Sequence, residues 1–200
     1  MTARLVVLAS GNGTNLQAII DACESKQIDA QVVGVVSDKH EAFALNRAQC
    51  HNVETAVVAA KPHETRQQYD VRLSQIVGAW QPHIIVLAGF MRVLSNSFLS
   101  QFPNQVINIH PALPGELPGT RAIERAFVEF TQGSRNDTGV MVHFVPDEGV
   151  DNGPVIAQQT VPIHAADTLV TLEARMHATE HALVIDALQQ LITQQKAATS

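Results

Sequence analysis

The first half of the chain alternates between two patterns of hydrophobic and polar positions. Short, nearly continuous apolar runs are typical of buried strands. Such runs lie at residues 4–10, 31–38, 53–59 and 83–89. Between them, apolar residues recur at the spacing of an amphipathic helix, which predicts helices from Asn15 onward, over 41–50 and over 63–79. Strands that alternate with helices in this way predict a parallel, doubly wound α/β sheet.

The pattern is less regular after Gly89, but it still predicts further helices and strands. We expect a short helix at 96–102, a strand at 105–108, a helix at 119–130, strands at 138–145 and 153–163, and a final helix at 167–192. The last two strands can pair as a hairpin around a loop. The tail, residues 194–200, is expected to fray. Because no repeat or linker interrupts the pattern, we expect one domain that spans residues 1–200.

Composition and charge narrow the class of protein. The 200 residues are 46% hydrophobic and 16% charged, which is typical of a globular chain, and the formal net charge is −6. The sequence has no long basic run, so nucleic acid is not expected as a partner. It also has no apolar stretch of membrane length, so we expect a cytoplasmic protein without a membrane partner. Two cysteines are too few to set a disulfide framework.

A glycine-containing segment, "SGNGTN" at 10–15, joins the first expected strand to the first expected helix. Glycines allow a ligand to approach the backbone closely, and the N-terminus of a helix offers unpaired N–H groups to a phosphate. The dinucleotide fingerprint needs a third glycine, which residues 14–18 lack. A single phosphate is therefore the favoured ligand. Asp38, after the second strand, leaves a dinucleotide site as the alternative, although we favour a solvated loop residue there.

A second candidate site is the stretch "NIHPALPG" at 108–115. Alternation along a strand places Asn108 and His110 on the same face, and the prolines that follow end the strand. In an open parallel sheet, ligands bind at the carboxyl ends of strands. The segments at 11–15, 89–94 and 108–110 leave three such ends, so we expect them to meet at one edge of the sheet.

The acidic loop at 146–156 can supply a partner for His110. A carboxylate from Asp147, Glu148 or Asp151 beside the imidazole would raise the pKa of His110 and fix its orientation. Asn108 could then donate a hydrogen bond to a developing oxyanion. Such a set suits acyl or formyl transfer to an amine without a covalent enzyme intermediate. The chain shows no HExxH or CxxC pattern and no GxSxG elbow, so neither a metal site nor a serine hydrolase is expected.

Motifs along nearly the whole chain, residues 4 to about 192, resemble those of the folate-dependent glycinamide ribonucleotide formyltransferases. The matching motifs are "SGNGTNLQAIIDA", "VVSD", "LAGFMRVL", "NIHPALPG" with "PGT", "VHFV", "GVDNGPVIAQ" and "ATEHAL". Their order and spacing make the resemblance specific. It implies an α/β fold with a mostly parallel, twisted sheet of seven strands, a Rossmann-like N-terminal half and helices on both faces. It also implies a monomer or weak homodimer.

The resemblance assigns roles to individual residues. The catalytic residues it implies are Asn108, His110 and Asp151. The residues implied to bind the phosphate and ribose are Gly13, Thr14, Asn15 and Glu180. The residues implied to bind folate are Arg66, Met91, Arg92, Val93, Leu94, Asn108, Asp147, Glu148, Gly149 and Val150. No metal is implied.

The reaction that the resemblance implies moves the formyl group of 10-formyltetrahydrofolate, as co-substrate, onto the amine of glycinamide ribonucleotide. Asn108 and a protonated His110 would stabilise the oxyanion, and Asp151 would hold the imidazolium and assist proton transfer through water. Relatives that act on initiator tRNA or sugar nucleotides, or that hydrolyse the folate, generally carry a further domain. A non-catalytic nucleotide-binding module is the alternative from another class, but it leaves "NIHP" and "GVDNGP" unexplained.

Three positions depart from the usual family pattern. Asp151 follows His143 by eight residues, one more than usual, so the folate loop is expected to bulge and Asp147 or Glu148 could compete for the role of Asp151. Arg121 stands where a histidine is common. His177, in the final helix, occupies a variable position and is a candidate ligand contact.

Overall fold

The computed structural model describes residues 2–198 and contains seven strands and six helices within that range. The strands are β1 Ala3–Leu8, β2 Ala30–Ser37, β3 Thr55–Val57, β4 Ile84–Leu87, β5 Val106–His110, β6 Asp137–Phe144 and β7 Val155–Pro162. The helices are α1 Thr14–Glu24, α2 Phe43–Cys50, α3 Arg66–Ala79, α4 Asn96–Leu99, α5 Ala122–Thr131 and α6 Leu169–Ala198. Each element that the hydrophobic pattern predicts is present, with shifts of a few residues at its ends.

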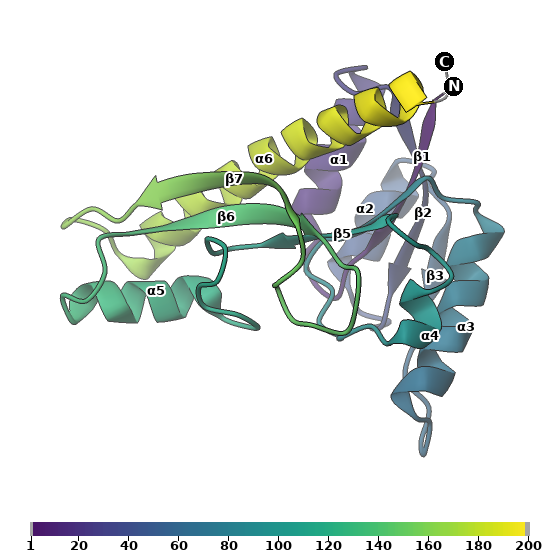
Figure 1. The fold of residues 1–200 in the computed structure, drawn as a ribbon, viewed down its shortest axis with the longest axis horizontal. Coiled ribbons are helices and arrows are strands. Elements are labelled where there is room, and N and C mark those ends of the chain that lie inside the picture. Colours follow the sequence, from purple (N-terminus) through teal and green to yellow (C-terminus); the bar gives the residue numbers. More distant parts are fainter. Residues whose placement is uncertain (1, 199–200) are drawn as a thin grey trace.

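All seven strands form one sheet in the order β3-β2-β1-β4-β5-β6-β7. The first five strands of the sequence pair in parallel, whereas β6 and β7 are antiparallel to their neighbours. Figure 1 shows the twist of this sheet and the long β6–β7 hairpin, which extends away from the parallel half. The prediction of a mostly parallel, seven-stranded α/β sheet is confirmed.

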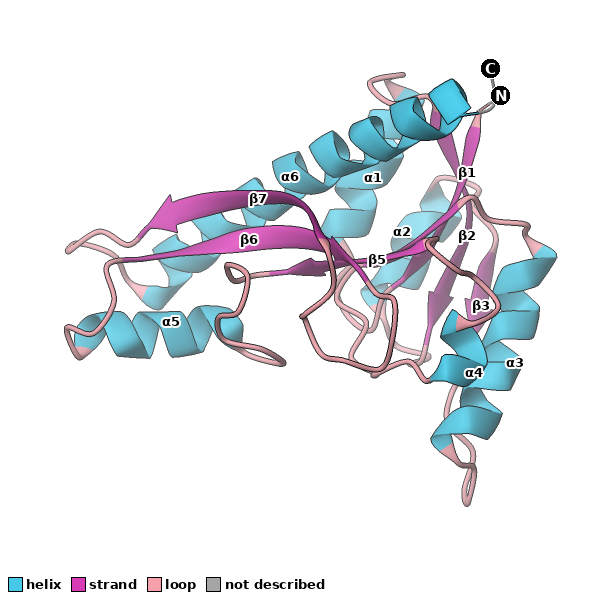
Figure 2. Ribbon diagram, in the orientation of Figure 1, coloured by secondary structure: helices cyan, strands magenta, loops and turns pink. Residues whose placement is uncertain are grey.

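Helices cover both faces of the sheet, as Figure 2 shows. Side chains alternate along β1: Leu5 and Val7 pack with α1, α2, α5 and α6 on one face, and Val6 and Leu8 pack with α3 and α4 on the other. Because both faces are buried, the central strands are continuous apolar runs. The polar residues lie after the ends of these strands, in the loops at the edge of the sheet.

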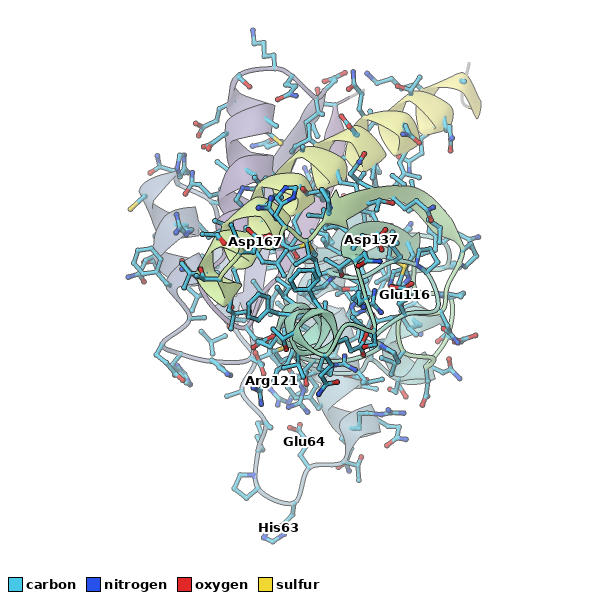
Figure 3. All side chains as sticks on the ribbon, turned by 90° about the vertical axis from the view of Figure 1, so that its left-hand side faces the viewer. His63, Glu64, Glu116, Arg121, Asp137 and Asp167 are labelled. Carbon is cyan, nitrogen blue, oxygen red and sulfur yellow. The ribbon has the colours of Figure 1, made fainter. Side chains whose placement is uncertain are left out.

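Helix α3 begins with a reciprocal cap. The Thr65 hydroxyl accepts from the Gln68 N–H, and the Gln68 side chain accepts from the Thr65 N–H. The segment just before this cap projects from the molecule with His63 and Glu64 on it (Figure 3). Arg72 pairs with both carboxylate oxygens of Glu64, at 2.7 and 2.8 Å, and lowers the pKa of that carboxyl to about 2. The cap and this pair explain why α3 starts at Arg66 rather than at 63.

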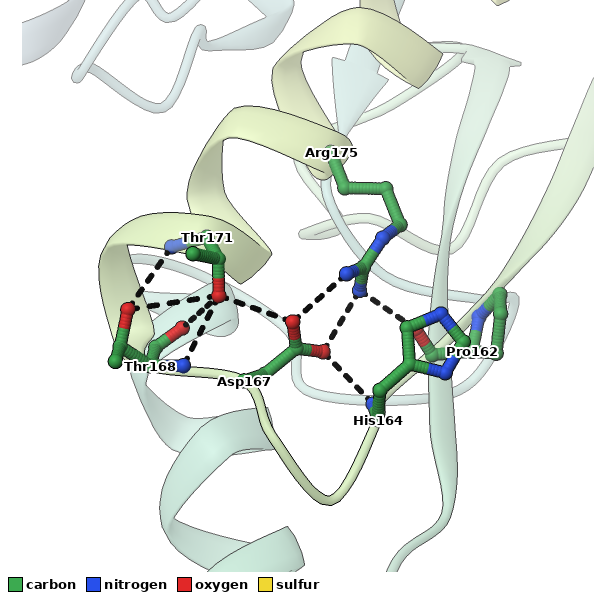
Figure 4. A network of polar contacts seen from close by, with 6 residues as sticks. All are labelled: Pro162, His164, Asp167, Thr168, Thr171 and Arg175. Carbon is green, nitrogen blue, oxygen red and sulfur yellow. Dashed lines mark hydrogen bonds and ion pairs between the residues drawn. The ribbon is translucent and has the colours of Figure 1, made fainter.

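Helix α6 is anchored at its start and extends beyond the predicted end. Asp167 accepts from Arg175, from Thr171 and from the His164 N–H, and Arg175 also donates to the Pro162 carbonyl (Figure 4). The prediction that residues 194–198 fray is wrong, since α6 continues to Ala198 and Lys196 pairs with Asp29. Residues 199 and 200 lie outside the described part. Within residues 2–198, no helix combines the length and apolarity needed to cross a membrane.

Candidate active site

A cleft of about 450 Å³ lies at the carboxyl ends of β1, β4 and β5. The segments at 11–15, 87–94 and 108–111 line it, together with residues from the β5–α5 loop, the β6–β7 loop and α6. Segments remote in sequence thus meet at the sheet edge where parallel sheets bind ligands. The candidate catalytic residues Asn108, His110 and Asp151 are all among the lining residues.

The glycine loop before α1 is shaped to accept an anion. Gly13 is the N-cap of α1 and has a φ of 76°, in the left-handed region that favours glycine. A Cβ on Gly13 would lie 2.7 Å from the Cβ of Ala44. No side chain caps the first turn of α1, and Gly13, Thr14 and Asn15 line the cleft, so the positive end of the helix dipole lies beside the cleft. The described part of the chain offers no partner to the buried Asn15 Oδ1.

The loop after β4 is tied to this glycine loop. The Ser10 N–H donates to the Gly89 carbonyl at 3.0 Å, and the Met91 N–H donates to Ser10 Oγ at 2.8 Å. Met91 and Val93 are exposed apolar side chains at the cleft, and Leu94 is buried. The Arg92 guanidinium lies 3.8 Å from the centroid of the Tyr69 ring. The loop therefore offers an apolar surface beside the glycine loop, in the same cleft.

Groups from β5, β6 and the β5–α5 loop converge on the carboxylate of Asp151. Asn108 Nδ2 donates to Asp151 Oδ1 at 2.9 Å and contacts His143 Nε2 at 3.2 Å. His143 Nδ1 lies 2.8 Å from its neighbour's carbonyl, Phe144 O, which favours a proton on Nδ1 and leaves Nε2 as an acceptor. The Gly119 N–H donates to Asp151 Oδ2 at 2.8 Å. Asp151 itself has a φ of 53°, so the loop is held in an unusual backbone conformation.

His110 is buried between two acceptors. Its Nδ1 lies 3.3 Å from Asp151 Oδ2, and its Nε2 lies 3.1 Å from the Leu117 carbonyl. Burial lowers the pKa of His110 more than Asp151 and the Leu117 carbonyl raise it. The prediction of a raised pKa is wrong for this reason, although the effect of Asp151 has the expected direction. Burial also raises the pKa of Asp151, but the neighbouring His143, the hydrogen bond from the Gly119 N–H and the imidazole of His110 outweigh it, and the net shift is downward.

The three acids of the β6–β7 loop have different partners. Asp147 Oδ1 accepts from the Gly149 N–H within the loop, at 2.8 Å. Glu148 forms an ion pair with Arg66, the first residue of α3, and accepts from the Asn96 N–H at 2.9 Å. Only Asp151 faces His110 among these three acids. Asp147, Gly149 and Val150 line the cleft, whereas Glu148 and Arg66 do not.

Helix α6 adds a carboxylate and an imidazole to the same cleft. Glu180 is buried, and its Oε2 lies 2.7 Å from His177 Nδ1. This hydrogen bond raises the pKa of His177. Arg121 also lines the cleft, and its side chain is exposed at the N-terminus of α5. Asp38 does not line the cleft, and it is half-buried with a buried oxygen rather than solvated.

Three further residues of the site, His143, Leu117 and Gly119, have no role that the sequence patterns assign. His143 pairs with Asn108 in the antiparallel register of β5 and β6, which alternation alone does not fix. Leu117 and Gly119 act through backbone groups, so their residue types carry little information. Within residues 2–198, no three His, Cys, Asp or Glu side chains are grouped to hold a metal ion.

A comparison with protein families matches residues 3–188 to the formyl transferase family. A phosphoribosylglycinamide formyltransferase from Dictyostelium discoideum is 41% identical, over 96% of this chain and the full length of that protein. The enzyme of the same name from Escherichia coli is 41% identical, over 90% of this chain and 82% of the relative.

Solved structures agree with the sequence comparison. A phosphoribosylglycinamide formyltransferase from Bacillus halodurans superposes with a TM-score of 0.89 at 34% identity, covering 96% of each chain. A glycinamide ribonucleotide transformylase from Geobacillus kaustophilus superposes with a TM-score of 0.88 at 38% identity, covering 96% of this chain and 99% of that one. The similarity thus extends over the sheet, the cleft and α6 alike.

Proposed function

This chain belongs to the formyl transferase family, and we propose that it transfers the formyl group of 10-formyltetrahydrofolate to the amine of glycinamide ribonucleotide. Full-length relatives that are named phosphoribosylglycinamide formyltransferase support this substrate and a place in purine biosynthesis. We further propose that residues 1–200 act as one formyltransferase domain. The observation that carries the proposal is that the glycine loop before α1 and the polar cluster around Asp151 line one cleft.

The phosphorylated substrate is proposed to bind at the α1 end of the cleft. The first-turn N–H groups after Gly13, at Thr14 and Asn15, would hold the phosphate. Glu180, buried in the same cleft, is an acceptor that suits ribose hydroxyls. The neighbouring His177 would add positive charge when it is protonated, since its pKa is raised. This arrangement directs the glycinamide amine of the substrate away from α1, along the cleft.

The folate is proposed to bind between the β4 loop and the β6–β7 loop. Met91, Val93 and Val150 are exposed apolar side chains there and suit the faces of a pteridine ring. Backbone groups of residues 91–94 and 147–150 would form hydrogen bonds with the polar edge of the pteridine ring. Arg66 lies outside the cleft and is paired with Glu148, so a contact between Arg66 and the folate requires an extended tail of the ligand.

The amine is proposed to attack the formyl carbon directly, which forms a C–N bond and a tetrahedral oxyanion. Breaking the bond to N10 of the folate completes the transfer, and the proton lost by the amine passes to N10 through water. Asn108 Nδ2 and His110 Nε2 are the donors for the oxyanion. In this structure they contact Asp151 and the Leu117 carbonyl, so they must turn toward the substrate. Asp151 would hold His110 and assist the proton transfer.

A formyl-transfer assay on the purified protein tests this function. The assay follows release of deformylated folate from 10-formyltetrahydrofolate, with and without glycinamide ribonucleotide. Release that depends on the ribonucleotide is expected. Release at the same rate without it would instead indicate a hydrolase, and no release under either condition would contradict the proposed reaction.

A further inference from the structure

The Leu117 carbonyl is shared by two side chains. It accepts from His110 Nε2 at 3.1 Å and from Arg125 Nη2, in α5, at 2.7 Å. The same Arg125 nitrogen also donates to the next carbonyl, that of Pro118, at 2.7 Å. Arg125 does not line the cleft, so it cannot be read as a substrate contact.

We propose that Arg125 is a positioning residue for the transfer step. It keeps the Leu117 carbonyl in place and hydrogen-bonded when His110 turns away from that carbonyl toward the oxyanion. This inference rests on the proposed function, in which His110 Nε2 is a donor to the oxyanion. It adds a residue that neither the sequence motifs nor the cleft lining includes.

The backbone around Leu117 needs such a contact to keep its conformation. Gly115, Leu117, Gly119 and Arg121 all have positive φ, with values of 79°, 44°, 80° and 58°. A leucine in this region is strained and persists only where its surroundings hold it. Arg125 donates hydrogen bonds to two successive carbonyls at that point. These bonds fix the orientation of the Leu117 peptide group.

Residues 117–119, to which Arg125 is hydrogen-bonded, also contact both His110 and Asp151. Leu117 supplies the acceptor for His110 Nε2, and two residues later the Gly119 N–H donates to Asp151 Oδ2 at 2.8 Å. A shift of residues 117–119 would therefore move the acceptor on one side of the imidazole and the carboxylate on its other side. Catalytic rates are sensitive to displacements of this kind.

Arg125 also lowers the cost of the switch that the mechanism requires. A carbonyl oxygen has two lone pairs, and Leu117 uses one for Arg125 and one for His110. When His110 turns its N–H to the oxyanion, the carbonyl remains hydrogen-bonded to Arg125. Without Arg125, the departure of His110 would leave this half-buried carbonyl unpaired, which is unfavourable. Loss of Arg125 should therefore slow turnover rather than weaken substrate binding.

Kinetics of Arg125→Gln and Arg125→Lys in the full chain test the inference. For Arg125→Gln we expect kcat to fall about tenfold or more, with the KM of each substrate changed by less than about twofold. Lysine can donate to the carbonyls, although without the planar fork of arginine, so Arg125→Lys should recover part of the lost kcat.

The matched control is Arg4→Gln. Arg4 also donates to two successive backbone carbonyls, Trp80 O at 2.7 Å and Gln81 O at 3.3 Å, but it lies away from the cleft. The kcat of Arg4→Gln should equal that of the wild type, even if the variant is less stable.

Three results would overturn the inference. They are a kcat of Arg125→Gln no lower than that of Arg4→Gln, a rise in KM without a fall in kcat, and no recovery by lysine. A wild type without ribonucleotide-dependent release would instead contradict the proposed function itself.

Discussion

Asn108 and Asp151 lie 43 residues apart in the sequence, and their side chains share a hydrogen bond of 2.9 Å in the cleft. The strand β5 places Asn108, and the β6–β7 loop returns Asp151 to it. His110, two residues after Asn108, faces the other oxygen of the same carboxylate at 3.3 Å. One carboxylate thus positions both proposed oxyanion donors, and the predictions below test what depends on it.

Asp151→Asn should lower kcat by about 10²–10⁴-fold, because the amide can neither balance an imidazolium at His110 nor orient both donors. Equilibrium binding of the ribonucleotide should change little, since the first turn of α1 is untouched. Asp21→Asn is the control, because Asp21 is an exposed carboxylate on α1 that accepts only from Gln17 in the contacts described. Unchanged turnover in Asp151→Asn would contradict its assigned role.

Gly13→Ala should damage the phosphate site. The new Cβ would lie 2.7 Å from that of Ala44, in a backbone conformation with a φ of 76°. We expect the free energy of unfolding to fall by about 1–3 kcal/mol and the KM for the ribonucleotide to rise. Gly11→Ala is the control for stability, since a Cβ there meets no atom within 4 Å. Equal unfolding free energies for the two variants would show that the loop does not need glycine at 13.

Glu148→Gln tests how the β6–β7 loop is held. Glu148 links the loop to Arg66 of α3 and to the Asn96 N–H at the start of α4. Loss of the charge weakens both links, so the loop should move more freely and the KM for the folate should rise. The KM for the ribonucleotide should stay constant. A rise in KM confined to the ribonucleotide would contradict a role of the loop in folate binding.

The pKa values of two cleft histidines should lie on opposite sides of 6.5, their ordinary value. The hydrogen bond that His177 donates to Glu180 raises the pKa of His177, whereas burial lowers the pKa of His110. The stability that His177 contributes is full below 6.5 and is lost as the pH rises through its folded pKa. The contribution of His110 is present above 6.5 and is lost as the pH falls through its folded pKa.

Titration of the imidazole resonances by NMR measures both values. Glu180→Gln should bring the pKa of His177 down toward 6.5 and leave that of His110 unchanged. If His110 instead titrated above 6.5, the effect of Asp151 would exceed that of burial, which is the reverse of the balance found here.

Much of the fold follows from local patterns in the sequence. The apolar runs of β1, β2 and β4 are continuous because both faces of the sheet are covered, and this made the strands easy to predict. The end of α6 was less predictable, because the pairing of Lys196 with Asp29 joins positions 167 residues apart. No local pattern could indicate that contact.

The site could be predicted only in part. Alternation places Asn108 and His110 on one face. The residues alone narrow the acid that meets them to three candidates in one loop, and the family resemblance selects Asp151 among these. Whether the loop would present Asp147, Glu148 or Asp151 depends on Arg66 and the Asn96 N–H, which hold Glu148 away from the cleft. The pKa of His110 could not be predicted either, because burial outweighs the neighbouring charge and burial is a property of the folded chain.

The most direct test of the central claim compares His110→Ala with the wild type in two measurements, ribonucleotide-dependent release of deformylated folate and calorimetric binding of glycinamide ribonucleotide. We expect turnover to fall by about 10²-fold or more, with ribonucleotide affinity within a few-fold of the wild type. That result would place the chemistry at His110 and show that binding of the ribonucleotide does not depend on this residue. Wild-type turnover in His110→Ala would contradict the account.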